Sequence, residues 1–161
     1  MIDQCQAGDI QRMYLIINEA ARGYDGVIPA DCYHQPYMPL DELEREMQRV
    51  TFLGWKENGE FVGIMGIEPV KDVTLIRHAY VLPRWQKQEI GSKLLNHLMG
   101  LTTTRRLLVG TYTANQRAIA FYQKHGFSLL PDKDDLLKNY WDITQRQIET
   151  SIVMGIDINR N

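Results

Sequence analysis

Two strand-like segments joined by a tight turn constrain the fold of this chain most. Residues 51–55 (TFLGW) and 61–70 (FVGIMGIEPV) flank KENGE, whose Asn58-Gly59 pair is a strong signal for a β-hairpin turn. Residues 73–82 (VTLIRHAYVL) form a further strand-like segment, which Pro83 ends. These segments predict a sheet in the middle of the chain.

Helix-like segments lie on both sides of these strands in the sequence. Apolar residues recur at helical spacing over 9–24 and again over 40–50, and Asp9 stands where the first helix would take its N-cap. Further helices are predicted over 90–98, 115–127 and 132–141. Gly126 is expected to close the helix that begins after Asn115.

Short strands are predicted near both ends of the chain and between the later helices. Residues 2–6 and 105–113 are strand-like, and a last strand is expected over 148–157. In that strand one face would be buried against helices, namely Ile148, Thr150, Ile152, Met154 and Ile156. The order of elements predicts an α/β (α+β) fold, in which helices cover both faces of a mixed sheet.

Length and composition exclude several classes of protein. The 161 residues, 44% hydrophobic and 24% charged, are most simply one domain over 1–161. A net charge of -2 and a pI near 6.1 argue against a nucleic-acid partner. Cys5 and Cys32 have neither metal-binding nor disulfide spacing, so we expect no metal. No apolar run is long enough to span a bilayer and the first ten residues do not form a secretory signal, so we expect a cytoplasmic protein without a membrane partner.

The segment QKQEIGSKLL, residues 86–95, lies where a strand passes into a helix. The first N–H groups of a helix are unpaired and carry partial positive charge, so this position suits a phosphate. Gly91 and Ser92 are small enough to let a ligand approach the backbone, and Lys87 adds a positive charge. Ordinary strand-to-helix turns also contain such residues, so the loop alone leaves both interpretations open.

A second segment, NQRAIAFYQKHGF at 115–127, favours the phosphate site, because the two segments together resemble the GNAT family of acyl-CoA-dependent N-acetyltransferases. In that family the loop reads Arg or Gln, two variable residues, Gly, one variable residue, and Gly or Ala. Gln86 and Gly91 fill the outer positions here, whereas Glu89 replaces the middle glycine. Asn115, followed seven residues later by Tyr122, matches the second motif. The resemblance covers nearly the whole chain and implies a three-layer αβα fold with a mixed, mostly antiparallel central sheet.

The resemblance also implies acetyl-CoA as co-substrate. The pantetheine arm would pair with the strand edge at Ala79, Tyr80 and Val81, as an added strand does. Backbone N–H groups of the loop would hold the pyrophosphate, and the residues concerned are Gln86, Lys87, Gln88, Glu89, Ile90, Gly91 and Ser92. Asn115 would cap its helix, and Tyr122 on the same helix face would contact the same ligand.

In such a family member the acetyl group moves directly from acetyl-CoA to a primary amine. A main-chain N–H near Val81 would stabilise the oxyanion. The thiol of CoA has a pKa of about 8.5, and the Tyr122 hydroxyl would act as the general acid that protonates the leaving thiolate. Tyr122 also has an ordinary interpretation, as a packed helix aromatic.

The base that deprotonates the amine is less well determined, although an alkylamine with a pKa of about 10.4 needs one. Some relatives carry a Glu five residues before the Asn, but Gly110 stands there in this chain. Glu68 is the first candidate, followed by His78 and then Glu149. Each has a structural alternative: Glu68 and Glu149 as solvated strand ends, and His78 as a histidine satisfied within the sheet.

Three functions are open on the sequence, and the first is favoured because Tyr122 is retained. The first is acetylation of a small-molecule or peptide amine, for which Asp31 and His34, in the loop between the first helices, could line the acceptor pocket. The second is a catalytically silent acyl-CoA-binding sensor or regulatory module, which Glu89 and Gly110 suggest. The third is an interaction domain that binds no CoA. A homodimer is common among similar proteins and is also left open.

Overall fold

The computed structural model describes residues 1–158, and the chain divides into two compact units. The first unit consists of Met1–Gly23, His34–Glu68 and Ile76–Leu101. The second unit consists of Tyr24–Tyr33, Pro69–Leu75 and the chain from Thr102 onwards. The expectation of one domain over 1–161 stays a prediction.

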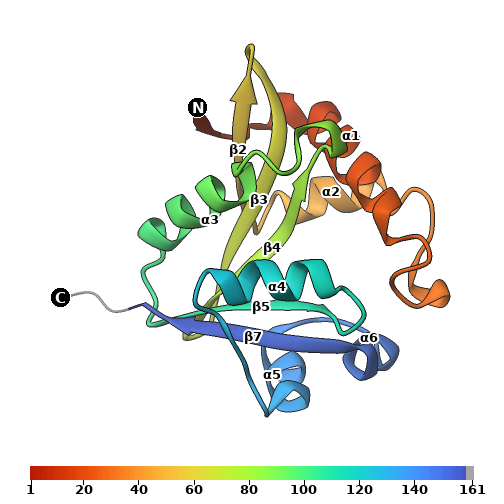
Figure 1. Cartoon of the computed structure of the whole chain (residues 1–161), viewed down its shortest axis with the longest axis vertical. Coiled ribbons are helices and arrows are strands. Elements are labelled where there is room, and N and C mark those ends of the chain that lie inside the picture. The colour runs from red at the N-terminus through yellow and green to blue at the C-terminus, as the bar shows by residue number, and fades with distance from the viewer. Residues whose placement is uncertain (159–161) are drawn as a thin grey trace. The chain divides into compact units, whose positions relative to one another are not determined.

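Helices and strands follow one another along the described residues much as the sequence predicts (Figure 1). The strands are β1 (Ile2–Gln4), β2 (Thr51–Glu57), β3 (Glu60–Val70), β4 (Val73–Val81), β5 (Arg106–Tyr112), β6 (Ser128–Leu129) and β7 (Ser151–Asp157). The α-helices are α1 (Ile10–Ala21), α2 (Leu40–Glu46), α3 (Ile90–Leu101), α4 (Gln116–Lys124), α5 (Lys133–Tyr140) and α6 (Gln145–Thr150). Short 3₁₀ turns cover Ala7–Asp9, Arg22–Tyr24, Ala30–Cys32 and Pro83–Trp85.

The first unit is built on neighbouring strands in the order β1-β2-β3-β4. The pairs β1–β2 and β2–β3 are antiparallel. Asn58 has a φ of 51° and Gly59 a φ of 79°, so both turn residues take the left-handed conformation that a type I′ hairpin requires. The predicted hairpin is therefore confirmed.

Helices cover both faces of the strands in the first unit. Figure 1 shows α3 on one side of β2–β4, and α1 with α2 on the other. A Cβ on Gly63 would stand 3.1 Å from Ile90 of α3, whereas one on Gly66 would clash with Val50, which follows α2. The odd and even residues of β3 thus face different helices, as the alternation of side chains along a strand requires.

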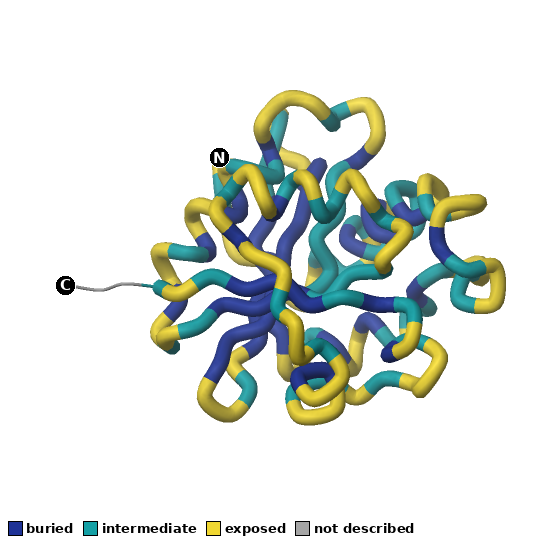
Figure 2. The backbone as a smooth tube through the Cα atoms, turned by 60° about the horizontal axis from the view of Figure 1, so that its bottom comes forward, coloured by how far each residue is buried: buried dark blue, intermediate teal, exposed yellow. Residues whose placement is uncertain are grey.

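In the second unit the first residues of β4 neighbour β5, which is followed by β7 and β6. The pairs β5–β7 and β6–β7 are antiparallel. Figure 1 shows α4 on one side of β5 and β7, with α5 and α6 on the other. Apolar residues on the α5 and α6 side form a buried cluster of Val73, Leu75, Leu108, Leu136, Leu137, Ile148 and Val153. Figure 2 shows the strands largely buried and the turns exposed, and the predicted α/β fold with helices on both faces and a mostly antiparallel sheet is confirmed.

The last strand is shorter than predicted, and its burial is not confined to the predicted face. Residues 145–150 form α6, so β7 begins at Ser151 and Ile148 belongs to a helix. Within β7, Ser151, Val153 and Gly155 are buried, whereas Ile152 and Ile156 are only partly buried. Met154 of the predicted face is buried as well, so β7 is at least partly buried on both faces and not on the predicted one alone. Thr144 starts α6 with a capping box, in which its hydroxyl accepts from the Gln147 N–H, and this cap outweighs the alternating pattern.

Asp9 marks the start of α1 as predicted, but it does not cap that helix through its side chain. Its carboxylate instead accepts a 2.7 Å hydrogen bond from the backbone N–H of Gln6. That bond closes the 3₁₀ turn before α1. The two-residue strand β6 was not predicted, because Ser128 and Leu129 carry no recognisable pattern.

Candidate functional site

The loop after β4 is tied to the end of that strand. The Gln86 side-chain amide donates a 3.0 Å hydrogen bond to the Val81 carbonyl, and the Gln86 N–H donates to the Pro83 carbonyl at 3.3 Å. At its other end the loop starts α3, because the Glu89 carbonyl accepts from the Lys93 N–H at 3.0 Å. The loop is therefore fixed at both ends by its own polar groups.

Two residues within this loop have left-handed backbones. Lys87 has a φ of 62° and Glu89 a φ of 65°, values that residues with a Cβ rarely adopt. Left-handed residues alternating with ordinary ones turn successive N–H groups toward a common point, which makes a concave site for an anion. Glu89 thus takes a left-handed conformation that a glycine at its position would adopt readily, and binding of a pyrophosphate by this loop stays a prediction.

Burial along β4 changes sharply at Ile76. Residues 73–76 are buried, whereas Arg77, His78, Ala79, Tyr80 and Val81 are only partly buried. The predicted pantetheine edge, Ala79 to Val81, thus lies on the more open half of the strand. The Val81 carbonyl is engaged by Gln86, and the Leu82 N–H pairs with the Val62 carbonyl at 2.9 Å.

His78 breaks the regular path of β4, because its φ is 57°. In a regular strand Arg77 and His78 would point to opposite faces. Here both side chains reach the same carboxylate: Arg77 Nη2 lies 3.6 Å from Glu46 Oε1, and His78 Nε2 lies 3.3 Å from Glu46 Oε2. The left-handed residue brings two successive basic side chains together.

Glu46 belongs to a buried cluster of charged residues in the first unit. Arg49 Nη2 lies 3.0 Å from Glu46 Oε1, and Arg77 Nη1 donates a 3.0 Å hydrogen bond to Glu68 Oε1. Arg49 Nε lies 3.8 Å from Glu68 Oε2. Glu46 is 7% exposed and Glu68 is 8% exposed, so each arginine contacts two buried carboxylates. The sequence analysis did not predict this cluster. Because Glu68 is buried, its alternative interpretation as a solvated strand end is wrong.

The charge state of Glu46 follows from these neighbours. Burial alone would raise the pKa of Glu46, but the contact with His78 and the charges of Arg77 and Arg49 outweigh it and lower the pKa to about 2. The carboxyl group is therefore ionised at neutral pH. Its Oε2 atom and His78 Nε2 face each other at 3.3 Å without hydrogen-bond alignment, and neither has another hydrogen-bonding partner among the described residues.

In the second unit Asn115 is the N-cap of α4. Its side-chain oxygen accepts a hydrogen bond from the Ala118 N–H at 3.3 Å, as predicted for this helix start. The Ile119 N–H in turn bonds to the Asn115 carbonyl at 3.2 Å, so the first turn of α4 is closed. A role of Asn115 in binding CoA stays a prediction.

Tyr122 lies where α4 ends in a Schellman motif. The Phe127 N–H donates to the Tyr122 carbonyl at 3.0 Å, and the Gly126 N–H donates to Gln123 at 3.0 Å. Gly126 supplies the left-handed residue, with a φ of 93°. The Tyr122 ring packs edge-on against Phe127 and Phe121, with centroids 5.3 and 5.1 Å apart. The predicted stop at Gly126 is confirmed, and it also fixes the position of Tyr122.

The Tyr122 side chain is buried, with the residue 4% exposed. Burial raises the pKa of Tyr122 above that of an ordinary phenol, and Tyr24 raises it further. The hydroxyl therefore stays protonated at neutral pH. A protonated phenol can donate a proton or a hydrogen bond, which agrees with the predicted role but does not test it.

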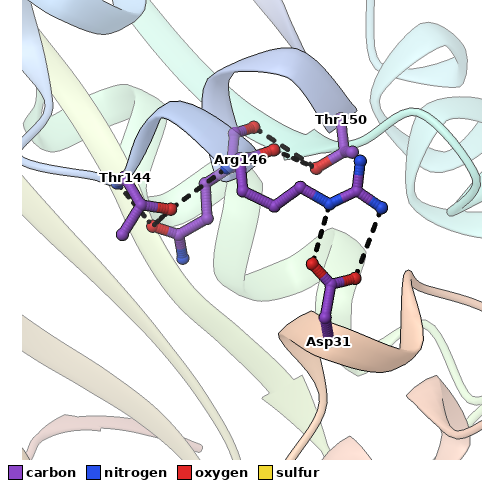
Figure 3. A network of polar contacts seen from close by, with 5 residues as sticks. Asp31, Thr144, Arg146 and Thr150 are labelled. Atoms are coloured by element: carbon purple, nitrogen blue, oxygen red, sulfur yellow. Dashed lines mark hydrogen bonds and ion pairs between the residues drawn. The ribbon is translucent and has the colours of Figure 1, made fainter.

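Glu149 is an exposed residue of α6 rather than the start of the last strand. Close by in the second unit, Arg146 of the same helix makes a two-pronged contact with Asp31, at 2.8 and 3.3 Å (Figure 3). The Arg146 hydrogen bond lowers the pKa of Asp31. Asp31 is therefore paired with a guanidinium, whereas His34 lies in the first unit with its Nδ1 atom 2.8 Å from the Pro36 carbonyl.

Gly110 shows why the carboxylate of some relatives has no counterpart here. A Cβ at Gly110 would stand 3.4 Å from the indole of Trp141 and 3.6 Å from Leu137. A larger side chain would need Trp141 to move. The space at this point of β5 is thus filled by the second unit's own core residues.

The predicted residues divide between the units. The first unit holds residues 79–81, the loop 86–92, Glu68 and His78, and the second unit holds Asn115, Tyr122 and Glu149. The structure adds Glu46, which the sequence analysis did not select because α2 carries five charged residues in seven positions, LDELERE. Among the described residues there is no cluster of His, Cys, Asp and Glu suited to a metal ion.

Comparison with known proteins identifies the family. Residues 3–127 match the model of the Acetyltransferase (GNAT) family. The chain belongs to the GNAT acetyltransferase family. Its loop 86–92 and its Asn115–Tyr122 pair both fall within the matched residues. None of the helices in the described part of the chain has the length and apolarity required to cross a membrane.

Solved structures of GNAT proteins show the same fold. The ribosomal-protein-S18-alanine N-acetyltransferase from Escherichia coli superimposes with a TM-score of 0.74 at 20% identity, covering 100% of this chain and 95% of that one. The PaiA N-acetyltransferase from Thermoplasma acidophilum, in complex with coenzyme A, gives 0.72 at 16%, covering 98% of each chain. Rv2747 from Mycobacterium tuberculosis, in complex with CoA and NLQ, gives 0.72 at 18%, covering 99% of each.

Proposed function

We propose that this protein is an acetyl-CoA-dependent N-acetyltransferase that acetylates a primary amine of a small molecule or peptide. The observation that carries the proposal is the loop 86–92, which leads into α3 and contains two left-handed residues, Lys87 and Glu89, although the middle glycine is absent. Two left-handed non-glycine residues strain this loop, and such strain is found mostly at functional sites. Two related structures, those of PaiA and Rv2747, were determined with CoA.

Acetyl-CoA supplies the thioester, and the chain supplies binding and proton transfer. Backbone N–H groups of residues 86–92 would hold the pyrophosphate, and the open half of β4, Ala79 to Val81, would pair with the pantetheine arm. Lys87 adds a positive charge to the loop. The predicted oxyanion donor is a main-chain N–H near Val81.

Tyr122 is the proposed general acid. Its burial keeps the hydroxyl protonated, and the Schellman motif fixes the backbone from which the ring projects. A fixed, protonated phenol can protonate a thiolate as it leaves. A binding module without chemistry has no need for that proton, so Tyr122 favours the enzyme over the silent sensor.

Among the candidate bases, we favour His78 over Glu68 and Glu149. Both oxygens of Glu68 lie against the guanidinium groups of Arg77 and Arg49, where they are held as ion pairs. Glu149 lies on the exposed side of α6, where its carboxylate accepts from Gln145 at 3.4 Å. His78 lies at the kink of β4, where its side chain keeps 14% of its surface exposed.

The direct test measures thiol release from acetyl-CoA with a panel of amines. The panel includes polyamines, arylalkylamines and a peptide with an N-terminal alanine, because one structural neighbour is named for acetylating such a residue. We expect turnover of at least one amine, and a loss on the order of 100-fold in kcat for Tyr122→Phe with unchanged CoA binding. CoA binding by calorimetry without any turnover would support the silent module, and absence of CoA binding would reject both. A homodimer and a cytoplasmic location remain predictions.

A further inference from the structure

The contact between Glu46 and His78 has the form of a carboxylate–imidazole pair. The two residues come from different elements, the last turn of α2 and the kinked part of β4. Glu46 Oε2 faces His78 Nε2 at 3.3 Å, and neither atom has a hydrogen-bonding partner within residues 1–158. A carboxylate beside one ring nitrogen selects the tautomer in which that nitrogen carries the proton.

The backbone of His78 is arranged for this contact at a cost. A φ of 57° is strained for a residue with a Cβ, and such strain is concentrated at functional sites. Without the kink, Arg77 and His78 would point to opposite faces and only one of them could reach Glu46. The strained residue is therefore what brings His78 to the buried carboxylate.

Of the two buried carboxylates in the charged cluster, only one contacts His78. Glu46 contacts it directly, whereas Glu68 on β3 contacts Arg77 and Arg49. The ring of Phe52 stacks on His78, and Arg77 and Arg49 contact the Glu46 carboxylate that faces it. Glu46 is thus the carboxylate that can fix the ring, and Glu68 is a closely matched control.

We propose that Glu46 is a positioning residue for His78, holding Nε2 protonated so that Nδ1 can take a proton from the acceptor ammonium. The inference rests on the proposed acetyltransferase function. In the step, an N–H bond of the ammonium breaks, a bond from the proton to Nδ1 forms, and the electron pair remains on the amine nitrogen for attack on the thioester. The resulting imidazolium is stabilised by the Glu46 carboxylate and later releases its proton to water.

Kinetics of three variants test the proposal. His78→Asn should lower kcat/KM on the order of 100-fold, and Glu46→Gln should lower it by a smaller factor, on the order of ten-fold, with the KM for acetyl-CoA unchanged. Glu46→Gln should also move the acidic limb of the pH profile to lower pH, because an imidazolium beside a neutral amide is less stable. Glu68→Gln removes the neighbouring buried carboxylate and should leave that limb in place. A limb that moves in Glu68→Gln and not in Glu46→Gln would overturn the proposal.

A measurement on the unmodified protein covers the case in which the variants fail to fold. The chain contains four histidines, so the ¹⁵N signals of the imidazole rings can be resolved and assigned. We expect neutral His78 as the Nε2–H tautomer, and finding Nδ1–H instead would disprove the positioning role. This result is independent of turnover. Absence of acetylation with every amine would refute the proposed function, while the tautomer would still decide whether Glu46 orients His78.

Discussion

Both units contain ion pairs between arginine and a carboxylate, but the carboxylates of Glu46 and Glu68 are buried in the first unit and that of Asp31 is exposed in the second. In the first unit Arg77 and Arg49 lie among the buried carboxylates of Glu46 and Glu68, whereas in the second unit Arg146 meets Asp31 at the surface (Figure 3). The surface pair has the better geometry, with two short contacts, yet water screens it. The cluster in the first unit has longer contacts, but its carboxylates belong to residues that are only 7% and 8% exposed, so little water can replace a lost partner. Burial, more than distance, decides how much depends on each group.

The largest effect is expected from removing one buried partner. Arg77→Met should lower the free energy of unfolding by about 3–5 kcal/mol, because the buried carboxylates of Glu46 and Glu68 would each lose a guanidinium partner. Urea unfolding followed by circular dichroism measures the change. Arg146→Met is the surface control and should shift the midpoint little. Equal losses in the two variants would contradict the comparison.

Lowering the pH should remove the stabilisation that the buried Glu46 carboxylate contributes. The pKa of Glu46 in the folded protein is about 2 and that of an unfolded Glu is 4.5, so its contribution is present above pH 4.5 and is lost as the pH falls toward 2. This contribution is on the order of 2–3 kcal/mol. Urea unfolding at pH 7, 5 and 3 should show wild type approaching Glu46→Gln as the pH falls. A difference that stays constant over this range would mean that the Glu46 carboxylate is not selectively stabilised by folding.

A further carboxylate, that of Glu89, lies on a strained and exposed loop. Glu89→Gly should raise the free energy of unfolding by about 1 kcal/mol by relieving the left-handed strain, and it should strengthen CoA binding by removing a negative charge. Lys87→Gly relieves the same strain but removes a positive charge, so it should weaken CoA binding. Thermal unfolding and calorimetry separate the two effects. Weaker CoA binding by Glu89→Gly would show that the carboxylate helps to hold the loop.

The smallest effect is expected at the surface pair. Asp31→Asn should leave the urea midpoint nearly unchanged at 0.5 M salt, since exposed charges are strongly screened there. At low salt a slight loss should appear and should vanish on adding salt. A loss that persists at high salt would mean that the two-pronged hydrogen bond, and not the charge, anchors the loop 30–32 to α6.

The sequence predicted the elements whose signals are local. The Asn58-Gly59 turn, the Asn115 cap and the Gly126 stop each depend on backbone rules that a few neighbouring residues satisfy. It was wrong at residues 148–150, although Thr144 and Gln147 form a capping box that could have indicated α6. The alternation that continues into β7 concealed that signal.

The charged cluster could not be predicted in the same way. The sequence of α2 resembles an exposed helix, and the burial of Glu46 depends on residues 77 and 78, more than thirty positions later. The left-handed conformation at His78 could not be predicted, because no glycine stands at that position. Likewise, the conformation of Lys87 and Glu89 is imposed by the closure of the loop and not by their own preferences.

The hydrogen bonds that end α4 limit insertions and deletions in this part of the chain. The Tyr122 carbonyl receives the Phe127 N–H that closes the helix, so the residue proposed to deliver a proton is also the one on which the helix terminates. A one-residue insertion or deletion between Tyr122 and Gly126 would rotate the phenol by about 100° or lose the cap. The spacing from Tyr122 to Gly126 should therefore tolerate changes of residue type at Gln123 and Lys124 but not changes of length.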